Sequence, residues 1–420
     1  MLHKPDRLNW RQSIISSAIR SVLALGAVDV ASLAASAKKS GYKVYAVDYH
    51  GDQDLKRNSI VSLSITEHED GFSYGNVLEK SCGEALLTLA ERLCESYQVD
   101  GSLLSSGLDD FPAILSELNR LVPILGNSPE LFRKVRDRST FFAEIQRLGI
   151  DCPETVTAEN RIEAKSIAKD IGFPVLIKPT QSFCGVGIRK ASNGQDLEEV
   201  LRAARQPEGK LVVQKCISGR HTSVSVISIP RKAQALAASE QLLGVHEIGQ
   251  LEPFGYCGNI VPLSESDAII DRCKAVAERV ATHFGLAGSN GIDMVISEEG
   301  RPYVIEVNPR FQGTIECVER ILGLNLVGTH VKACRDGILP NLSLETEGFC
   351  VRLVLFAKQR SVIPDLGVFD ECRDVPFPGT VVDRGDPLCS VVVQGRDRGL
   401  VVERTKEISS SIYKMLSSVG

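Results

Sequence analysis

Four polar side chains occupy alternate positions where an apolar segment ends, in YVIEVNPRFQGT at residues 303–314. They are Glu306, Asn308, Arg310 and Gln312. A carboxylate and an amide oxygen are suitable ligands for a hard cation such as Mg²⁺. An arginine and a glutamine just beyond them could contact a transferring phosphoryl group or its acceptor. The residue types and their spacing therefore point to metal-assisted phosphoryl chemistry at the end of a strand.

A second apolar segment, GIDMVI at residues 291–296, precedes this one and predicts an antiparallel hairpin with it. With the turn centred on residues 299–300, Asp293 lies directly opposite Glu306. Asn308 shares their face, and Pro309 follows and ends the ladder. The apolar side chains are expected together on the other face: Ile292, Met294, Ile305 and Val307.

Two carboxylates opposite each other in a hairpin repel, because their Cβ atoms are only about 5 Å apart. The pair is stable if a cation lies between them or if one carboxyl is protonated. Mg²⁺ typically takes one or two protein carboxylates and completes its shell with water and substrate phosphates. The alternative interpretation is a solvent-facing hairpin with ordinary polar side chains.

A lysine lies at the end of an apolar strand in PVLIKPTQSFCGVGI, residues 174–188. Lys178 is unusual there unless its ammonium group has an anionic partner. The loop that follows contains Gly185 and Gly187, and its N–H groups could fold over phosphates. A purely structural loop is an equal alternative, since the pattern G-x-x-x-x-G-K-S/T is absent.

The segment KLVVQKCISG, residues 210–219, is apolar until Gln214 and Lys215. Backbone groups of such a strand can pair with an adenine edge, and Gln214 is placed to meet the exocyclic amine. By itself, this segment also suits an ordinary surface strand.

The elements that must position these residues fall into three regions. Residues 1–129 alternate short strands with helices and predict an open, largely parallel sheet covered by helices. Residues 130–340 form the central region, within which 155–230 is a compact α/β subdomain. Residues 341–420 combine short strands with a final helix, TKEISSSIYKML at 405–416, and predict a small α/β cap. Since no G-x-G-x-x-G follows the first strand, the first region is expected to supply one wall of a cleft rather than a dinucleotide site.

The beginning of the chain imitates a secretory leader, because basic residues precede SVLALGAVDVASLAASA. Asp29 interrupts this apolar run, which is also too short to span a membrane. A strand, a turn at Gly26 and a helix ending near Gly41 explain the same residues better. We therefore expect a soluble, cytoplasmic protein.

Composition narrows the class of partner. The chain has 420 residues, 43% hydrophobic and 24% charged, and a net charge of −5, so no basic surface is indicated that would attract nucleic acid or an anionic membrane. Its 12 cysteines include no C-x-x-C pair, so most are interpreted as small buried side chains in a reducing compartment.

In series, these segments resemble the ATP-grasp superfamily. The resemblance is carried by PVLIKP, VVQKCISG, GIDMVI and VIEVNPRFQGT, and it extends over the whole chain, with a C-terminal cap similar to that of biotin-carboxylase-like members. YAVDYHGDQD and GYCGNIVPL further resemble an archaeal-type subgroup of uncharacterised ATP-dependent carboxylate ligases. The fold class implied is α/β with ATP-grasp architecture: a pre-ATP-grasp domain at 1–129, a grasp region at 130–340 and the cap at 341–420.

The resemblance also implies roles for nucleotide-binding residues. Lys178 would contact the α- and β-phosphates of ATP. Gln214 and the backbone near Lys215 and Ile217 would contact adenine. Arg138 would take the place of a lysine that family members have in an Asp-Lys pair.

The remaining implied roles concern the metal and the reaction. Asp293, Glu306 and Asn308 would hold one or two Mg²⁺ ions, with Mn²⁺ as an alternative, and Arg310 would be the catalytic residue that stabilises the phosphoryl group in flight. Gly219-Arg220-His221 stands where many members have G-x-E, and no counterpart of the catalytic lysine segment of biotin carboxylase is found.

The activity implied is an ATP-dependent carboxylate–amine ligase that forms an amide through an acyl phosphate, with small-molecule substrates and a homodimeric assembly. Two alternatives remain open. One is a carboxylase acting through carboxyphosphate, or a phosphotransferase, on the same fold. The other is a non-catalytic nucleotide-binding protein.

Overall fold

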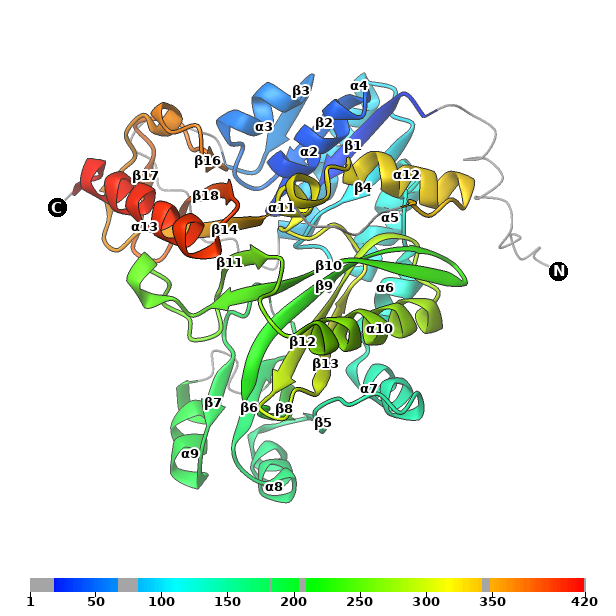
Figure 1. The fold of residues 1–420 in the computed structure, drawn as a ribbon, viewed down its shortest axis with the longest axis vertical. Helices are drawn as coiled ribbons and strands as arrows, with labels where there is room; N and C mark the ends of the chain where they lie inside the picture. The colour runs from blue at the N-terminus through cyan, green and yellow to red at the C-terminus, as the bar shows by residue number, and fades with distance from the viewer. Residues whose placement is uncertain (1–18, 67–81, 182, 204–208, 342–347, 419–420) are drawn as a thin grey trace.

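The computed structural model describes residues 19–66, 82–181, 183–203, 209–341 and 348–418. Figure 1 shows the first region at the top, the large central sheet below it, and a small lobe with α8 (Arg161–Ile171) and α9 (Gly194–Ala203) at the bottom. The C-terminal helix α13 (Arg398–Met415) lies beside the end of the large sheet formed by β14 (Phe349–Phe356) and β18 (Pro387–Gly395).

The first region contains a parallel four-stranded sheet with strand order β3-β2-β1-β4, as its alternating pattern predicts. The strands are β1 Ser21–Leu25, β2 Lys43–Asp48, β3 Val61–Ser64 and β4 Gly101–Leu104. The helices are α2 Val30–Lys39, α3 Gln53–Asn58, α4 Cys82–Ser96 and α5 Pro112–Leu121. All five residues of β1 are buried, as expected of a central strand covered on both faces.

The leader-like residues therefore form β1 and α2. Gly41, just past α2, has φ +85°, the left-handed conformation that ends many helices. Within the described residues, no helix is both long and apolar enough to cross a bilayer.

The central sheet has eight strands in the order β13-β12-β9-β10-β11-β14-β18-β16. Its strands are β9 Gly219–Ile229, β10 Lys232–Leu243, β11 Tyr256–Val261, β12 Gly288–Ser297, β13 Pro302–Asn308, β14 Phe349–Phe356, β16 Cys372–Arg373 and β18 Pro387–Gly395. Associated helices are α6 Pro129–Arg136, α7 Arg138–Arg147, α10 Asp267–Phe284, α11 Ile315–Leu322 and α12 Leu326–Asp336. One core lies between this sheet, α7 and α10, and another joins it to α2, α11 and α12.

The hairpin of β12 and β13 places Asp293 opposite Glu306, in agreement with the predicted register. A β-bulge lies next to this pair, so Met294 is opposite Val304 and Ile305 is the extra residue. Ile305 was expected on the buried face, and that expectation is wrong. Val304 and Val307 join the core, whereas Ile305 lines a cavity on the other side.

The small lobe has its own antiparallel sheet, with strand order β5-β8-β6-β7. Its elements are β5 Thr155–Ala158, α8 Arg161–Ile171, β6 Val175–Pro179, β7 Arg189–Ala191, α9 Gly194–Ala203 and β8 Leu211–Lys215. Residues 219–229, which fall in the predicted 155–230 subdomain, form β9 of the large sheet instead.

The C-terminal region extends the large sheet, because β14 pairs with β11 and β18 pairs with β14. A separate three-stranded sheet contains β15 Ser361–Val362, β17 Val381–Val382 and β19 Ser417–Ser418. Helix α13 spans Arg398–Met415 and begins seven residues before the predicted 405, where the Asp397 side chain accepts a hydrogen bond from the Leu400 N–H. The cap satisfies a free N–H of the first turn and so fixes the start of the helix before residue 405.

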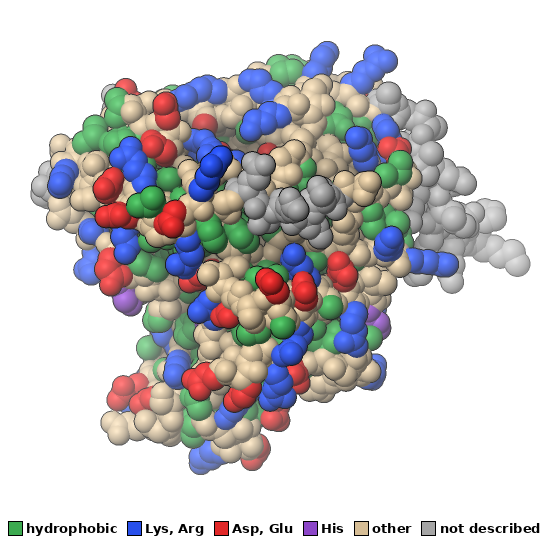
Figure 2. Space-filling model, in the orientation of Figure 1, with side chains coloured by type: hydrophobic (Ala, Val, Ile, Leu, Met, Phe, Trp, Pro, Cys, Tyr) green, Lys and Arg blue, Asp and Glu red, His purple; other side chains and the backbone are tan. Residues whose placement is uncertain are grey.

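The surface and the cysteines agree with the compositional analysis. On the face shown in Figure 2, acidic and basic side chains are interspersed. All 12 cysteines are free thiols, and seven of them are buried.

Candidate functional site

A cavity of about 260 Å³ lies between the small lobe, the large sheet and the first region. Its walls include every site residue predicted from the sequence. These are Arg138, Lys178, Gln214, Lys215, Ile217, Asp293, Glu306, Asn308 and Arg310. Segments about 170 residues apart in the chain therefore meet around one space.

The opposed carboxylates form the floor of this cavity. Asp293 accepts hydrogen bonds from the Ser223 hydroxyl at 2.6 Å and from the Asn308 amide at 3.0 Å. Burial, followed by the negative charge of Glu306, raises the pKa of Asp293 to about 6. The Glu306 side chain is 41% exposed toward the cavity. The pair thus has excess negative charge, which a cation would relieve.

Arg310 is held in place before any ligand binds. Its Nε donates to Asp109 Oδ1 at 3.1 Å, and its Nη2 donates to Asn308 Oδ1 at 2.9 Å. The nearby charges of Asp109, Glu306 and Asp293 outweigh burial and raise the pKa of Arg310. Asp109 belongs to the loop after β4, so the first region orients a residue that lies just past β13 of the large sheet.

Arg136, at the end of α6, is a site residue that the sequence analysis missed. Its Nε lies 2.7 Å from Asp110 Oδ1, and its Nη1 lies 3.4 Å from Glu306 Oε1. The last turn of α6 contains three basic residues, which looks like ordinary compensation of the helix dipole. Only the packing of α6 against the hairpin shows that this one points inward.

Lys178 and Arg138 are cations without a carboxylate partner. Arg138 donates to the Pro179 carbonyl at 3.2 Å. Among the residues the structure describes, neither side chain has an acidic group within ion-pair distance, and Lys178 has no hydrogen bond either. Burial and the charge of Arg138 lower the pKa of Lys178 to about 8. Two half-buried cations that repel each other form a binding place for an anion.

The strand β8 contributes to the opposite wall. The Gln214 amide is buried and donates to the Thr155 hydroxyl at 2.8 Å, so its carbonyl oxygen is the group left to accept from a ligand. The Lys215 ammonium turns away and donates to the carbonyls of Gly172 and Phe173. Ile217 follows the strand and lines the cavity.

The Gln312 side chain, which was expected to contact a phosphoryl group or acceptor, forms hydrogen bonds with two serines of β9 instead. Its amide nitrogen donates to Ser223 Oγ at 2.8 Å, and its amide oxygen accepts from Ser225 Oγ at 3.2 Å. A Cβ on Gly291 would lie 1.8 Å from the Gln312 nitrogen, so a glycine is needed opposite it. Gln312 therefore acts as a support for Ser223 and, through it, for Asp293.

The glycine-containing loop of the small lobe covers the cavity. The Gly187 N–H donates to Glu252 Oε2 at 3.0 Å, and Arg189 forms an ion pair with the same carboxylate. Gly185 has φ +77°, and a Cβ there would lie 1.9 Å from the Phe254 carbonyl oxygen. The loop is thus held against the β10–β11 connection by these contacts. Both Gly185 and Gly187 contact that connection through their backbones.

Two histidines, His221 in β9 and His246 in the β10–β11 connection, differ in position. His221 lines the cavity, where burial and Lys178 lower its pKa. The His246 ring contacts the Gln250 carbonyl at 2.8 Å within its own loop.

Comparisons with known proteins agree with this architecture. Residues 135–314 match the model of the ATP-grasp domain. The uncharacterized protein MJ0776 of Methanocaldococcus jannaschii is 23% identical over 90% of this chain and 88% of its own length.

Two solved structures have a similar fold. The biotin carboxylase domain of 2-oxoglutarate carboxylase from Hydrogenobacter thermophilus, a dimer in complex with MgADP, ADP and bicarbonate, has a TM-score of 0.72 at 17% identity, covering 96% of this chain and 92% of that one. L-amino acid ligase from Bacillus licheniformis has a TM-score of 0.69 at 13% identity, covering 96% and 100%. At such identities the likeness concerns the fold alone.

Proposed function

Because this chain contains an ATP-grasp domain, we propose that it is an ATP-dependent carboxylate–amine ligase. It would form an amide through an acyl phosphate and release ADP and phosphate. The similar fold of an L-amino acid ligase supports this reaction class.

The observation that carries the proposal is the separation of charge in the cavity. Lys178 and Arg138 present positive charge without a carboxylate partner in the described part of the chain. Asp293 and Glu306 present negative charge across the same space, and Arg136 contacts only Glu306, at 3.4 Å. A polyphosphate with a bound divalent cation would satisfy both halves at once.

The donor set suits Mg²⁺. Among the described residues, no group of three or more acidic, histidine or cysteine side chains could hold a metal by itself. Two carboxylates and an amide oxygen are what Mg²⁺ takes from a protein when phosphates and water supply the other ligands. Asp293, Glu306 and Asn308 would hold it, and it would supply charge neutralisation during phosphoryl transfer. Mn²⁺ would suit the same oxygen ligands.

The other residues would act by binding and orientation. Lys178 and Arg138 would bind the nucleotide phosphates, and Gln214 and the backbone at Ile217 would contact adenine. Arg310, oriented by Asp109, would stabilise the charge that develops on the transferring phosphoryl group. The fastened loop at 183–187 would exclude water, which would otherwise consume an acyl phosphate.

A thermal-shift titration with ATP and Mg²⁺, separately and together, tests the site. A ligand at 100 times its dissociation constant stabilises a protein by about 2.7 kcal/mol. We expect this response in the wild type and its loss in Glu306→Gln. Glu298→Gln is the matched control, since it removes the same charge from the exposed turn of the same hairpin. A wild type that ignores every combination would refute the nucleotide site.

The reaction itself is tested by ADP release. A ligase requires a carboxylate together with an amine, whereas a carboxylase requires bicarbonate. If ATP binds but no ADP is released with either class of acceptor, the result would favour a nucleotide-binding protein without ligase activity.

We also propose the division at 1–129, 130–340 and 341–420, and a homodimeric assembly like that of the Hydrogenobacter domain. Light scattering of the purified protein measures its mass in solution and so tests the homodimer.

A further inference from the structure

The first region contributes a wall that the proposed nucleotide and metal sites do not use. In its sheet, β1 lies between β2 and β4, so the chain leaves β1 toward one side and returns on the other. Ligands of open α/β sheets bind outside the carboxyl ends of the strands at such a switch point. The segments that follow β1 and β4 carry Asp29 and Ser106, and both residues line the cavity.

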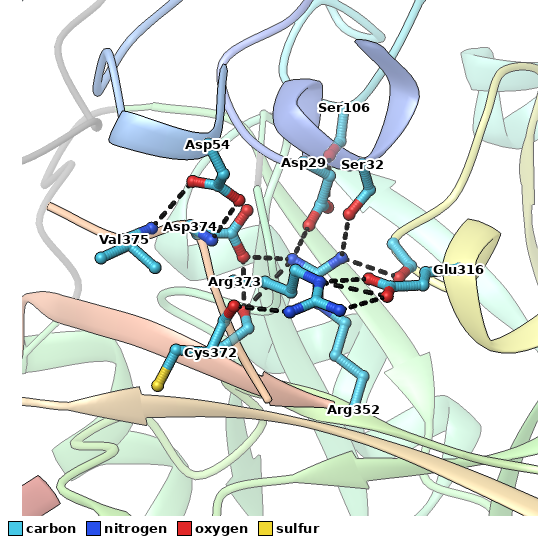
Figure 3. A network of polar contacts seen from close by, with 12 residues as sticks. Asp29, Ser32, Asp54, Ser106, Glu316, Arg352, Cys372, Arg373, Asp374 and Val375 are labelled. Carbon is cyan, nitrogen blue, oxygen red and sulfur yellow. Dashed lines mark hydrogen bonds and ion pairs between the residues drawn. The ribbon is translucent and has the colours of Figure 1, made fainter. Parts of the chain in front are cut away.

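Asp29 has an unusual backbone conformation, with φ 63° and ψ 15°, which residues other than glycine adopt rarely. It directly precedes α2, yet its side chain does not cap that helix. Instead, Oδ1 lies 2.6 Å from the Arg352 guanidinium, and Oδ2 accepts a long 3.4 Å hydrogen bond from the Ser106 hydroxyl. Figure 3 shows Asp29 placed between Ser106 and Arg352.

The Arg352 guanidinium contacts Asp29 through Oδ1. It is 2% exposed and also forms an ion pair with Asp374 at 2.5 Å, so one guanidinium serves two carboxylates. Its Nη1 donates to the Gly313 carbonyl at 2.9 Å, which fixes the backbone of Gly313 beside Asp29. Asp29 therefore shares this cation with Asp374, which leaves its Oδ2 with the long contact to Ser106.

A second acceptor converges on the same point. A Cβ on Gly313 would lie 3.0 Å from Asp29 Oδ2 and 3.2 Å from the Tyr256 hydroxyl oxygen. The Tyr256 hydroxyl donates a hydrogen bond to Asn259 Oδ1 at 2.5 Å. Its oxygen can therefore act only as an acceptor toward the cavity. Burial, followed by the charge of Asp29, raises the pKa of Tyr256 and keeps it protonated.

We propose that Asp29, Tyr256 and Gly313 form the subsite that binds the protonated amino group of the amine co-substrate. Two acceptors, one of them charged, face an opening that a glycine leaves free, and an alkylammonium group has donors only. Asp109, the other carboxylate on this wall, is already bound by Arg310. The assignment of the bound cation as co-substrate rests on the proposed ligase function.

The test uses n-butylammonium as the probe on the full-length protein, with n-butanol, butyrate and potassium ions at equal concentration as comparisons. We expect saturable thermal stabilisation by butylammonium alone, both with and without ADP and Mg²⁺. Butylammonium affinity should fall at least tenfold in Gly313→Ala, whose methyl group would fill the opening while leaving the Asp29–Arg352 pair in place.

Gly367→Ala is the matched control, because its Cβ would also lie 3.0 Å from an aspartate oxygen, that of Asp365, in another part of the fold. It should bind the probe like the wild type. Tyr256→Phe should weaken binding less than Gly313→Ala, since the carboxylate remains.

An equal response to potassium or butyrate, no response to butylammonium, or full binding in Gly313→Ala would overturn the subsite. These outcomes are independent of the Glu306→Gln test. Loss of the response to ATP with Mg²⁺ refutes the ligase proposal, whereas a normal response with no ammonium binding refutes the subsite alone.

Discussion

Two clusters of buried charge lie close together in this protein, and they differ in how completely their charges are paired. Around Arg352 and Arg373, nearly every charge has a fixed partner (Figure 3). Arg373 contacts both oxygens of Glu316, and the Asp54 carboxylate accepts the N–H groups of Asp374 and Val375.

The cavity cluster is incompletely paired. Lys178 is half-buried with no hydrogen-bond or ion-pair partner among the described residues, and the Asp293 carboxyl faces Glu306 across the hairpin. A paired cluster stabilises one arrangement of the chain, whereas unpaired buried charge costs free energy until a ligand completes it. The two clusters therefore differ in how far their charges are satisfied. Asp29 belongs to both, since its Oδ1 pairs with Arg352 and its side chain also lines the cavity.

The largest expected effect comes from breaking the paired cluster. Arg352→Met leaves Asp29 and Asp374 buried without their cation, and we expect a loss of about 3–5 kcal/mol in the free energy of unfolding. Urea denaturation measures it. Arg335→Met, which removes an exposed ion pair with Asp336, should cost less than about 1 kcal/mol. Equal effects of the two variants would contradict the distinction.

Replacing a cation of the cavity with methionine should leave stability intact and weaken ligand binding instead. Lys178→Met removes an unpaired, half-buried ammonium group, so the stability of the free protein should stay level or rise. Its affinity for ATP with Mg²⁺ should fall about 10–100-fold, or about 1.4–2.7 kcal/mol, measured by calorimetry. A strongly destabilised variant would mean that Lys178 has a structural partner after all.

The carboxylate pair predicts a pH dependence. The pKa of Asp293 is raised to about 6 in the folded protein, so between about pH 4 and 6 the folded state holds more protons than the unfolded one. Wild-type stability should therefore fall, relative to Asp293→Asn, by an amount on the order of 1 kcal/mol as pH rises through that window. Urea midpoints from pH 4 to 7 measure the difference between the two proteins. A difference that stays constant with pH would contradict the raised pKa of Asp293.

The smallest expected effect concerns the loop that covers the cavity. Glu252→Gln weakens its contact with Arg189 and the Gly187 N–H, so nucleotide affinity should fall about two- to fivefold, or about 0.4–1 kcal/mol. Glu159→Gln, which loses an exposed pair with Lys210 in the same lobe, should bind nucleotide normally. A lower affinity in both variants would point to a general effect on the lobe.

Sequence alone was informative wherever the signal was local. Two apolar segments predicted β12 and β13, and the two-residue period of a strand placed Asp293, Glu306 and Asn308 on one face. The predicted turn would have given a uniform register, whereas the ladder changes register at Ile305. On the turn side of the bulge the observed register differs by one residue from the predicted one. Beyond the bulge the two registers agree, so the expected Asp293–Glu306 pairing was correct.

Tertiary structure decided which charges are paired. Arg136 has the same local sequence character as its basic neighbours in α6, and only packing directs it toward Asp110 and Glu306. Asp29 and Arg352 are more than 300 residues apart, and no period or spacing connects them. Backbone geometry repeats every two or 3.6 residues and can be predicted from a short window of sequence. Charge pairing across a cavity depends on how separate elements dock, so it became visible only in the folded molecule.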